Sequence, residues 1–198
     1  MTEIYLIRHA EAEGNIFRRI HGHYNSLLTP RGFRQAAALG KRFENIPLDG
    51  CFASDLTRTC QTARAIYVPK GLQLHRDARL RERNLGWWDD YATGYIRYFY
   101  PKEMDAFSHD PAHWICDGAE SYEELTDRLL AGLRDAANAM TAAVLPSCAT
   151  VLPFIACCCG FSSKMNRKSW RTATIRRCPI FFMTRGRFPT ISSTTIPT

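Results

Sequence analysis

The stretch EIYLIRHAEAEGN, residues 3–15, decides the fold. The apolar run from Ile4 to Ile7 is short and rich in β-favouring side chains, which predicts a buried strand over residues 3–7. Arg8 and His9 follow directly, at the carboxyl end of this strand. An arginine and a histidine at a strand end can also be ordinary surface or core-edge residues, so their meaning depends on the rest of the chain.

The segments that follow alternate between helical and strand patterns. Thr29 is a helix N-cap, and Pro30 suits the first helical turn. Small and apolar residues then recur at helical spacing, at Phe33, Ala36, Ala37, Gly40 and Phe43. Further strands are expected over residues 49–54 and 72–76, and further helices over 56–67, 94–107 and 121–140. This order predicts an α/β fold of three layers, in which a mostly parallel sheet is flanked by helices.

The charge of the chain is divided unevenly. The 198 residues include 26 Lys and Arg and 19 Asp and Glu, for a net charge of +7. Residues 1–147 contain 18 of the basic and all 19 of the acidic residues, so they carry −1, whereas residues 148–198 carry +8. A surface built for nucleic acid normally interleaves basic residues with the fold that presents them. We therefore expect no nucleic-acid partner.

The N-terminus and the cysteines indicate the compartment. Glu3 and Arg8 flank an apolar run that is too short for a signal peptide, so we expect a cytoplasmic protein. Cys51, Cys60 and Cys116 lack the spacing of disulfide or metal frameworks, which suits reduced thiols. The triplet at residues 157–159 matches no such framework either.

One uncharged stretch is long enough to be considered as a membrane segment. It comprises the 28 residues between Asp135 and Lys164. Pro146 and Pro153 interrupt it, and several polar residues dilute its apolar character. We therefore expect no membrane anchor.

Five separated segments carry a family resemblance. In chain order they are LIRHAEAEGN, HGHYNSLLTPRGFRQAAALG, SDLTRTCQTA, LRERNLGWW and DGAESYEEL. Together they resemble the histidine phosphatase superfamily, also called the phosphoglycerate mutase-like family, from about residue 3 to about residue 152. The resemblance implies an enzyme that forms a phosphohistidine, needs no cofactor or metal, and acts on a small phosphorylated substrate.

The resemblance also implies roles for individual residues. A phosphomonoester is dianionic, so its site needs fixed guanidinium groups and an unprotonated nitrogen nucleophile. His9 corresponds to the nucleophile, and Arg8 and Arg58 to the groups that hold the phosphoryl oxygens. Asn15 corresponds to a hydrogen-bond donor to the same phosphate. Glu82 corresponds to the carboxyl group that protonates the leaving oxygen and then activates water.

Simpler interpretations of the same residues remain open from the sequence. Arg58 could face solvent on its helix, and Glu82 could form an ion pair with Arg81 or Arg83. The histidines at 21, 23, 109 and 113 could be read as metal-binding pairs, but no carboxylate or thiol recurs beside them. We therefore expect no metal site.

The last quarter of the chain departs from the family pattern, which requires a second histidine at the end of a central strand. Residues 149–152 begin such a strand, but no histidine follows His113, and Pro153 removes a ladder donor. A frameshift near residues 150–154 would explain this, because the frame starting at each third base encodes His or Tyr across Phe154 and Ile155. The sequence thus predicts an incomplete histidine phosphatase domain over 1–152 and an aberrant tail over 153–198.

The expected function is hydrolysis of small phosphomonoesters through a phosphohistidine on His9, impaired in this chain by the missing second histidine. Phosphoglycerate mutase-type phosphoryl transfer is one alternative. A non-catalytic protein that binds phosphorylated ligands is another. The aromatic-rich segment over residues 87–119 is expected to cover the pocket, while the physiological substrate and the oligomeric state stay open.

Overall fold

The computed structural model describes residues 2–142, 152–157, 174–177 and 182–188. The strands are β1 (Thr2–Ile7), β2 (Gly50–Ala53), β3 (Leu74–Arg76), β4 (Leu152–Cys157), β5 (Thr174–Arg177) and β6 (Phe182–Phe188). The helices are α1 (Glu13–Ile16), α2 (Pro30–Phe43), α3 (Thr57–Tyr67), α4 (Thr93–Phe99), α5 (Pro101–His109) and α6 (Tyr122–Ala142). Short 3-10 helices span Ala78–Leu80 and Gly86–Trp88.

The strands form a single six-stranded sheet in the order β3-β2-β4-β1-β6-β5. The neighbours from β3 through β1 are parallel, whereas β6 runs antiparallel to β1 and β5 antiparallel to β6. β1 therefore lies inside the sheet, between β4 and β6. The predicted α/β fold with a mostly parallel sheet is confirmed.

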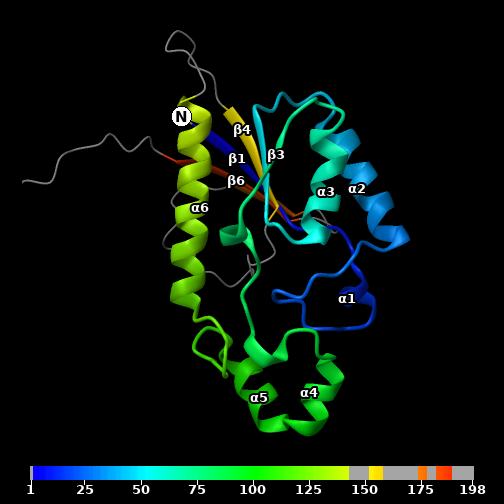
Figure 1. Ribbon diagram of the computed structural model, residues 1–198, viewed down its shortest axis with the longest axis vertical. Coiled ribbons are helices and arrows are strands. Elements are labelled where there is room, and N and C mark those ends of the chain that lie inside the picture. Colours follow the sequence, from blue (N-terminus) through cyan, green and yellow to red (C-terminus); the bar gives the residue numbers. More distant parts are fainter. Residues whose placement is uncertain (1, 143–151, 158–173, 178–181, 189–198) are drawn as a thin grey trace, which may run out of the picture.

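The two faces of the sheet are covered by different helices (Figure 1). Ile4 and Leu6 of β1 belong to a core cluster with the apolar face of α6. Ile7 is in a second cluster with residues of α2 and α3, and Tyr5 packs against it. Because side chains alternate between the faces of a strand, one short strand anchors both helical layers.

Helix α2 begins as its sequence predicts but buries a different stripe. Thr29 caps the helix, its hydroxyl oxygen accepting a hydrogen bond from the Gly32 backbone N–H at 2.9 Å. The buried face consists of Gly32, Ala36, Leu39 and Phe43. Phe33, part of the expected apolar pattern, is instead 52% exposed. The helix is thus placed by Leu39 and Phe43, and Phe33 contributes little to the core.

The single helix expected over residues 94–107 is wrong. Helix α4 ends at Phe99, and α5 begins at Pro101, with Tyr100 between them at φ −130° and ψ 56°. A residue before proline avoids the helical conformation, while proline itself suits the first turn of the next helix. Both helices pack around Trp88 and Trp114, in a cluster separate from the sheet (Figure 1).

Strand β4 lies between β1 and β2 despite its proline. Pro153 pairs with Glu3 of β1 and precedes Phe154, the first residue that pairs with β2. Near the start of a strand the missing N–H is tolerated, because only one neighbour extends that far. Phe154 and Ile155 lie opposite Ile4 and Tyr5, in the middle of the strand.

No helix in the described part of the chain is long and apolar enough to cross a membrane. The longest of them, α6, has 21 residues and carries several charged side chains. Most of the uncharged stretch considered above, at residues 143–151 and 158–163, lies outside the described residues.

Candidate active site

His9 is buried just beyond the end of β1, with 5% of its surface exposed. Its Nδ1 lies 2.6 Å from the carbonyl oxygen of Ala10, which places the ring proton on Nδ1. The Nε2 atom is buried and has no hydrogen-bond partner among the described residues. Burial, and then the charge of Arg58, lower the pKa of His9 to about 3. At neutral pH, Nε2 therefore carries a free lone pair, as a nucleophile requires.

Thr62 of α3 fixes the backbone after His9. The Ala10 backbone N–H donates to Thr62 Oγ1 at 3.0 Å, and that hydroxyl donates in turn to the Arg58 carbonyl at 2.7 Å. Ala10, whose carbonyl orients the His9 ring, is thus held in place by the first turns of α3. No local sequence signal marks Thr62 for this role.

Arg58 lies in the first turn of α3 and is completely buried. Its Nη1 donates to the Tyr24 carbonyl at 2.5 Å and its Nη2 to the Gly22 carbonyl at 3.0 Å. Its Nε is buried without a hydrogen-bond partner among the described residues. The interpretation that Arg58 faces solvent is therefore wrong. A buried guanidinium held by neutral carbonyls keeps most of its charge available for an anion.

The loop that presents these carbonyls depends on Gly22. This residue has φ +39°, and a Cβ there would collide with the carboxylate of Asp89. Asp89 accepts hydrogen bonds from the backbone N–H of His23 at 2.7 Å and of Leu85 at 3.2 Å. Asp89 therefore holds the loop around Gly22, whose carbonyls bind Arg58, against the segment that follows Glu82.

Glu82 places its carboxylate beside Arg58, with Oε2 3.6 Å from Nη2. Its side chain is 27% exposed, yet burial raises the pKa of the carboxyl group to about 7, against the opposing charges of Arg58 and Arg8. A carboxyl group with this pKa can both donate and accept a proton near neutral pH. The structure therefore places the predicted acid–base group next to Arg58, the predicted phosphate-binding arginine.

The arginines on either side of Glu82 have other partners. Arg81 forms a two-point ion pair with Asp55. Arg83 donates to backbone carbonyls, including that of Trp114 at 2.6 Å, and stacks on the Tyr122 ring. The interpretation that Glu82 pairs with Arg81 or Arg83 is therefore wrong.

The backbone of Glu82 is held from two sides. Its carbonyl oxygen lies 2.7 Å from Nη2 of Arg128 and 3.0 Å from Nε2 of His23. Arg128, on α6, also donates to the carbonyls of Arg79 and Arg81 and pairs with Glu120. The segment that carries Glu82 is thus held against α6 through three of its backbone carbonyls.

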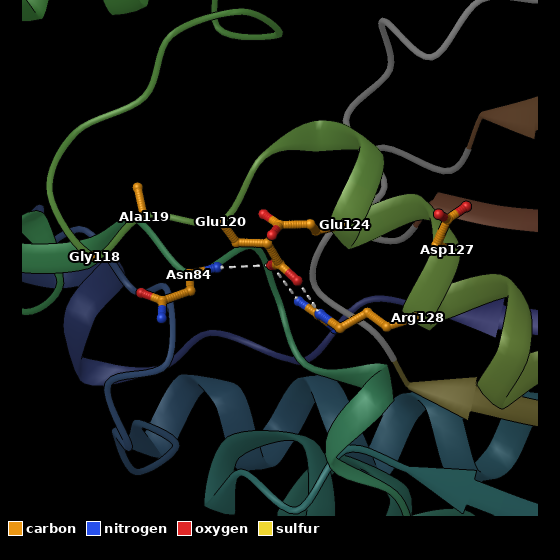
Figure 2. A pocket seen from close by; sticks show the side chains of 7 residues that line it. All are labelled: Asn84, Gly118, Ala119, Glu120, Glu124, Asp127 and Arg128. Atoms are coloured by element: carbon orange, nitrogen blue, oxygen red, sulfur yellow. Dashed lines mark hydrogen bonds and ion pairs between the residues drawn. The ribbon is translucent and has the colours of Figure 1, made fainter.

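An open depression of about 540 Å³ lies beside Arg128. Figure 2 shows its lining residues, which are Asn84, Gly118, Ala119, Glu120, Glu124, Asp127 and Arg128. Three carboxylates and one guanidinium line it, and that guanidinium is already paired with Glu120 (Figure 2). This depression does not suit a phosphate dianion, and none of its lining residues is among the candidate catalytic or phosphate-binding residues.

Arg8 and Asn15 lie at the rim of the site. The Arg8 side chain is exposed, yet its charge lowers the pKa of His9 and of His21, so it acts within electrostatic range of both rings. The side-chain oxygen of Asn15 accepts a hydrogen bond from the Ala12 backbone N–H at 2.8 Å. Asn15 thus closes the loop after His9, and its amide nitrogen is the group that the predicted phosphate contact requires.

The histidines considered as metal-binding pairs separate into different environments. His21 approaches His9, with ring centroids 5.3 Å apart, whereas His23 contacts the Glu82 carbonyl. His109 and His113 are exposed and lie against Asp105 and Asp110. Among the described residues no group of three or more His, Cys, Asp or Glu side chains could hold a metal ion.

Comparison with known proteins begins with the family. A sequence model of the histidine phosphatase superfamily (branch 1) matches residues 4–175, and so runs past residue 152. The probable phosphoglycerate mutase GpmB of Salmonella choleraesuis (strain SC-B67) is 31% identical over 144 residues, covering 67% of this chain and 62% of that protein. GpmB of Citrobacter koseri is 33% identical over 145 residues, with the same coverage. The chain thus spans less than two thirds of the length of these relatives.

Solved structures agree with this assignment. YhfR of Bacillus stearothermophilus is 27% identical with a TM-score of 0.69, covering 78% of this chain and 73% of that one. A mycobacterial glucosyl-3-phosphoglycerate phosphatase, solved with VO3, is 25% identical with a TM-score of 0.68, covering 80% and 76%. With the family match extending over most of the chain, the protein belongs to the histidine phosphatase superfamily.

Proposed function

We propose that this protein hydrolyses small phosphomonoesters by way of a phosphohistidine on His9. The observation that carries the proposal is the state of His9: a buried, neutral imidazole whose Nδ1 is bound and whose Nε2 has no partner among the described residues. Arg58 supplies a buried positive charge beside it. Glu82 supplies a proton donor whose pKa is about 7.

The first step transfers the phosphoryl group to the enzyme. The Nε2 lone pair of His9 attacks phosphorus, and the bond from phosphorus to the leaving oxygen breaks. The protonated carboxyl group of Glu82 gives its proton to that oxygen, so the product leaves as an alcohol. Arg58 and Arg8 stabilise the charge on the phosphoryl oxygens in the transition state, and Asn15 adds a hydrogen bond.

The second step returns the enzyme to its starting state. The ionised Glu82 takes a proton from a water molecule, whose oxygen attacks phosphorus. The bond between phosphorus and Nε2 breaks, and inorganic phosphate leaves. Glu82 is thereby protonated again, and His9 regains its lone pair.

The substrate class rests on the similar proteins. The mycobacterial neighbour is named for a small phosphorylated sugar acid, which supports a small phosphorylated metabolite as substrate. The GpmB relatives are named as probable phosphoglycerate mutases, which favours phosphoryl transfer as the second candidate. We favour hydrolysis, because a mutase must hold the displaced bisphosphate and exclude water, usually with longer insertions than this chain has.

We propose in addition that this chain is impaired. No histidine follows His113, so the second pocket histidine of the family pattern is not encoded. We propose 1–152 as an incomplete catalytic domain and 153–198 as a tail read out of frame. We also propose a cytoplasmic location without a membrane partner, and the near-neutral charge of residues 1–147 supports the absence of a nucleic-acid partner.

Phosphoenzyme trapping tests the proposal. The chain is quenched during turnover of radiolabelled p-nitrophenyl phosphate, and the expected label is acid-labile, alkali-stable and located on His9. His9→Asn should lose the label and at least about a thousandfold in turnover. His75→Asn is the matched control, because His75 stacks on Phe52 outside the site. A chain that binds phosphate but never becomes labelled would instead be a non-catalytic binder.

A further inference from the structure

We propose that Asp55 and Arg81 form a positioning pair, which directs the side chain of Glu82 toward the phosphoryl group held beside Arg58. The inference rests on the proposed function, in which Glu82 protonates the leaving oxygen. Its first support is the ion pair itself. Nε of Arg81 donates to Oδ1 of Asp55 at 2.6 Å, and Nη2 contacts Oδ2, so guanidinium and carboxylate meet at two points. The hydrogen bonds from Arg81 hold the pKa of the Asp55 carboxyl group below its usual range, which keeps the pair ionised.

The second support is that Asp55 lies on a loop fixed to Arg58. The loop joins β2 to α3, and Asp55 lies between Ser54 and Leu56. Oγ1 of the buried Thr59 lies 2.9 Å from the Ser54 carbonyl oxygen and 2.7 Å from that of Leu56. These contacts close the loop onto the first turn of α3, which carries Arg58. A group that Asp55 binds is therefore held in a fixed position relative to Arg58.

The third support is the course of the backbone from Arg81 to Glu82. Arg81 is extended, with φ −63° and ψ 160°, and the φ of Glu82 is not positive. Successive side chains of an extended segment point away from each other. With Arg81 bound to Asp55, the Glu82 side chain is directed elsewhere, and its Oε2 lies 3.6 Å from Nη2 of Arg58. That distance is too long for a hydrogen bond, so the contact with Arg58 does not by itself fix the carboxyl group.

The exposure of the pair indicates a role in orientation rather than in stability. The side chains of Asp55 and Arg81 are 33% and 32% exposed. An ion pair open to water contributes little to the free energy of unfolding, because solvent screens it and both side chains lose freedom. A two-point contact nevertheless fixes orientation. Since a displacement of about 1 Å can cost about a hundredfold in rate, a weakly stabilising pair can still control proton transfer.

Rates of phosphoenzyme formation from two esters test the inference on the full chain. An alkyl phosphate needs a proton from Glu82, whereas p-nitrophenyl phosphate needs little. Asp55→Asn and Arg81→Gln should each slow the alkyl ester about 10- to 30-fold, and p-nitrophenyl phosphate less than about threefold. The double variant should lose no more than either single variant, because the two residues act together. Asp135→Asn is the matched control, since it removes an exposed carboxylate from Arg79, and it should slow neither ester.

Two further measurements separate positioning from general damage. Orthovanadate, which adopts the geometry of the transferring phosphoryl group, should bind both single variants as it binds the unmodified chain. Their urea midpoints should shift by less than about 0.5 M.

The outcomes distinguish the inference from the proposed function. Equal slowing of both esters, unchanged rates, or failure of both single variants to fold would each overturn the inference and leave the role of His9 intact. An unmodified chain that forms no phosphoenzyme from the alkyl ester also overturns the inference. One that forms none from either ester overturns the proposed function as well.

Discussion

The backbone carbonyl of Glu82 accepts a hydrogen bond from Nη2 of Arg128 at 2.7 Å. The segment that carries Glu82, the proposed acid–base group, is thereby held against α6, a helix that contributes no candidate catalytic or phosphate-binding side chain itself. Glu120 holds the Arg128 guanidinium in turn, as Figure 2 shows. A residue that never touches substrate thus determines where the carboxyl group of Glu82 lies.

Replacing Arg128 should therefore affect both activity and stability. Arg128→Met leaves the carbonyls of Arg79, Arg81 and Glu82 without their donor, so we expect turnover to fall about tenfold. We also expect a loss of about 2–4 kcal/mol in the free energy of unfolding. Turnover of p-nitrophenyl phosphate and urea denaturation measure the two effects. Arg134→Met, an exposed position on the same helix, should change neither.

The protonation state of Glu82 should determine how the rate of phosphoenzyme formation depends on pH. Because burial raises the pKa of Glu82 to about 7, the acid form is present below neutral pH and is lost as the pH rises. The rate should fall above that pKa for an alkyl phosphate, and less for p-nitrophenyl phosphate, whose leaving group needs little protonation. Glu82→Gln should slow the alkyl ester about 10²- to 10⁴-fold and remove the pH dependence. Equal losses on both esters would contradict the acid role.

Acid should unfold the protein through its buried histidines. The pKa values of His9 and His21 are about 3 and about 4 in the folded chain, below the ordinary 6.5. Between 6.5 and these folded-state pKa values, the unfolded chain binds more protons than the folded chain. The free energy of unfolding therefore rises with pH and is lost as the pH falls through this window. Glu82, between its ordinary 4.5 and about 7, and Asp89, whose pKa burial also raises, act in the opposite sense, whereas burial also lowers the pKa of His23 and so adds to the effect of His9 and His21.

Substituting the two histidines should therefore flatten this dependence. In urea denaturation from pH 4 to 7, the double variant His9→Asn, His21→Gln should lose much of the slope. Each histidine contributes up to about 1.4 kcal/mol per pH unit. His113→Gln, whose side chain is 87% exposed, serves as the control and should keep the slope.

Gly22 should tolerate no side chain. In Gly22→Ala the new Cβ meets the Asp89 carboxylate and the backbone is strained at φ +39°. We expect a loss of about 2–3 kcal/mol in unfolding free energy and weaker vanadate binding, because the Gly22 carbonyl holds Arg58. Gly71→Ala is the matched control, because Gly71 has φ +65° but open space around it. Only the backbone strain, about 1 kcal/mol, is expected there. Equal losses at the two sites would show that the contact with Asp89 is unimportant.

The gene itself tests the origin of the tail. The frame starting at the third base of each codon should stay open beyond residue 153 and give a histidine codon across Phe154 and Ile155. A stop codon or a tyrosine codon there would contradict the frameshift. The chain restored to that frame should hydrolyse p-nitrophenyl phosphate faster than the present chain, by orders of magnitude.

Local patterns predicted the elements that depend on local chemistry. The strand before His9 and the cap at Thr29 are present, and the helix expected over residues 121–140 begins at a capping box of Ser121 and Glu124, because neighbouring residues alone determine these features. The break between α4 and α5 was also visible in Pro101, yet the apolar periodicity on either side concealed it.

The site was only partly predictable. His9 and Glu82 were identified from family motifs, but the burial of Arg58 depends on carbonyls more than 30 residues away. His21 was considered from the sequence only together with His23 as a possible metal-binding pair, because its nearness to His9 comes from a loop that Gly22 turns. Such long-range juxtapositions have no signature in sequence periodicity.

The position of β1 in the sheet also bears on how the protein is made. Its two neighbours, β4 and β6, come from residues 152–157 and 182–188, far along the chain. During synthesis β1 therefore leaves the ribosome long before its two neighbours and stays unpaired on both edges until they have followed. His9, just beyond β1, is likewise made well before the strands that complete its surroundings. An error in translating the later strands consequently acts on the loop that carries His9, although every residue of that loop is correct.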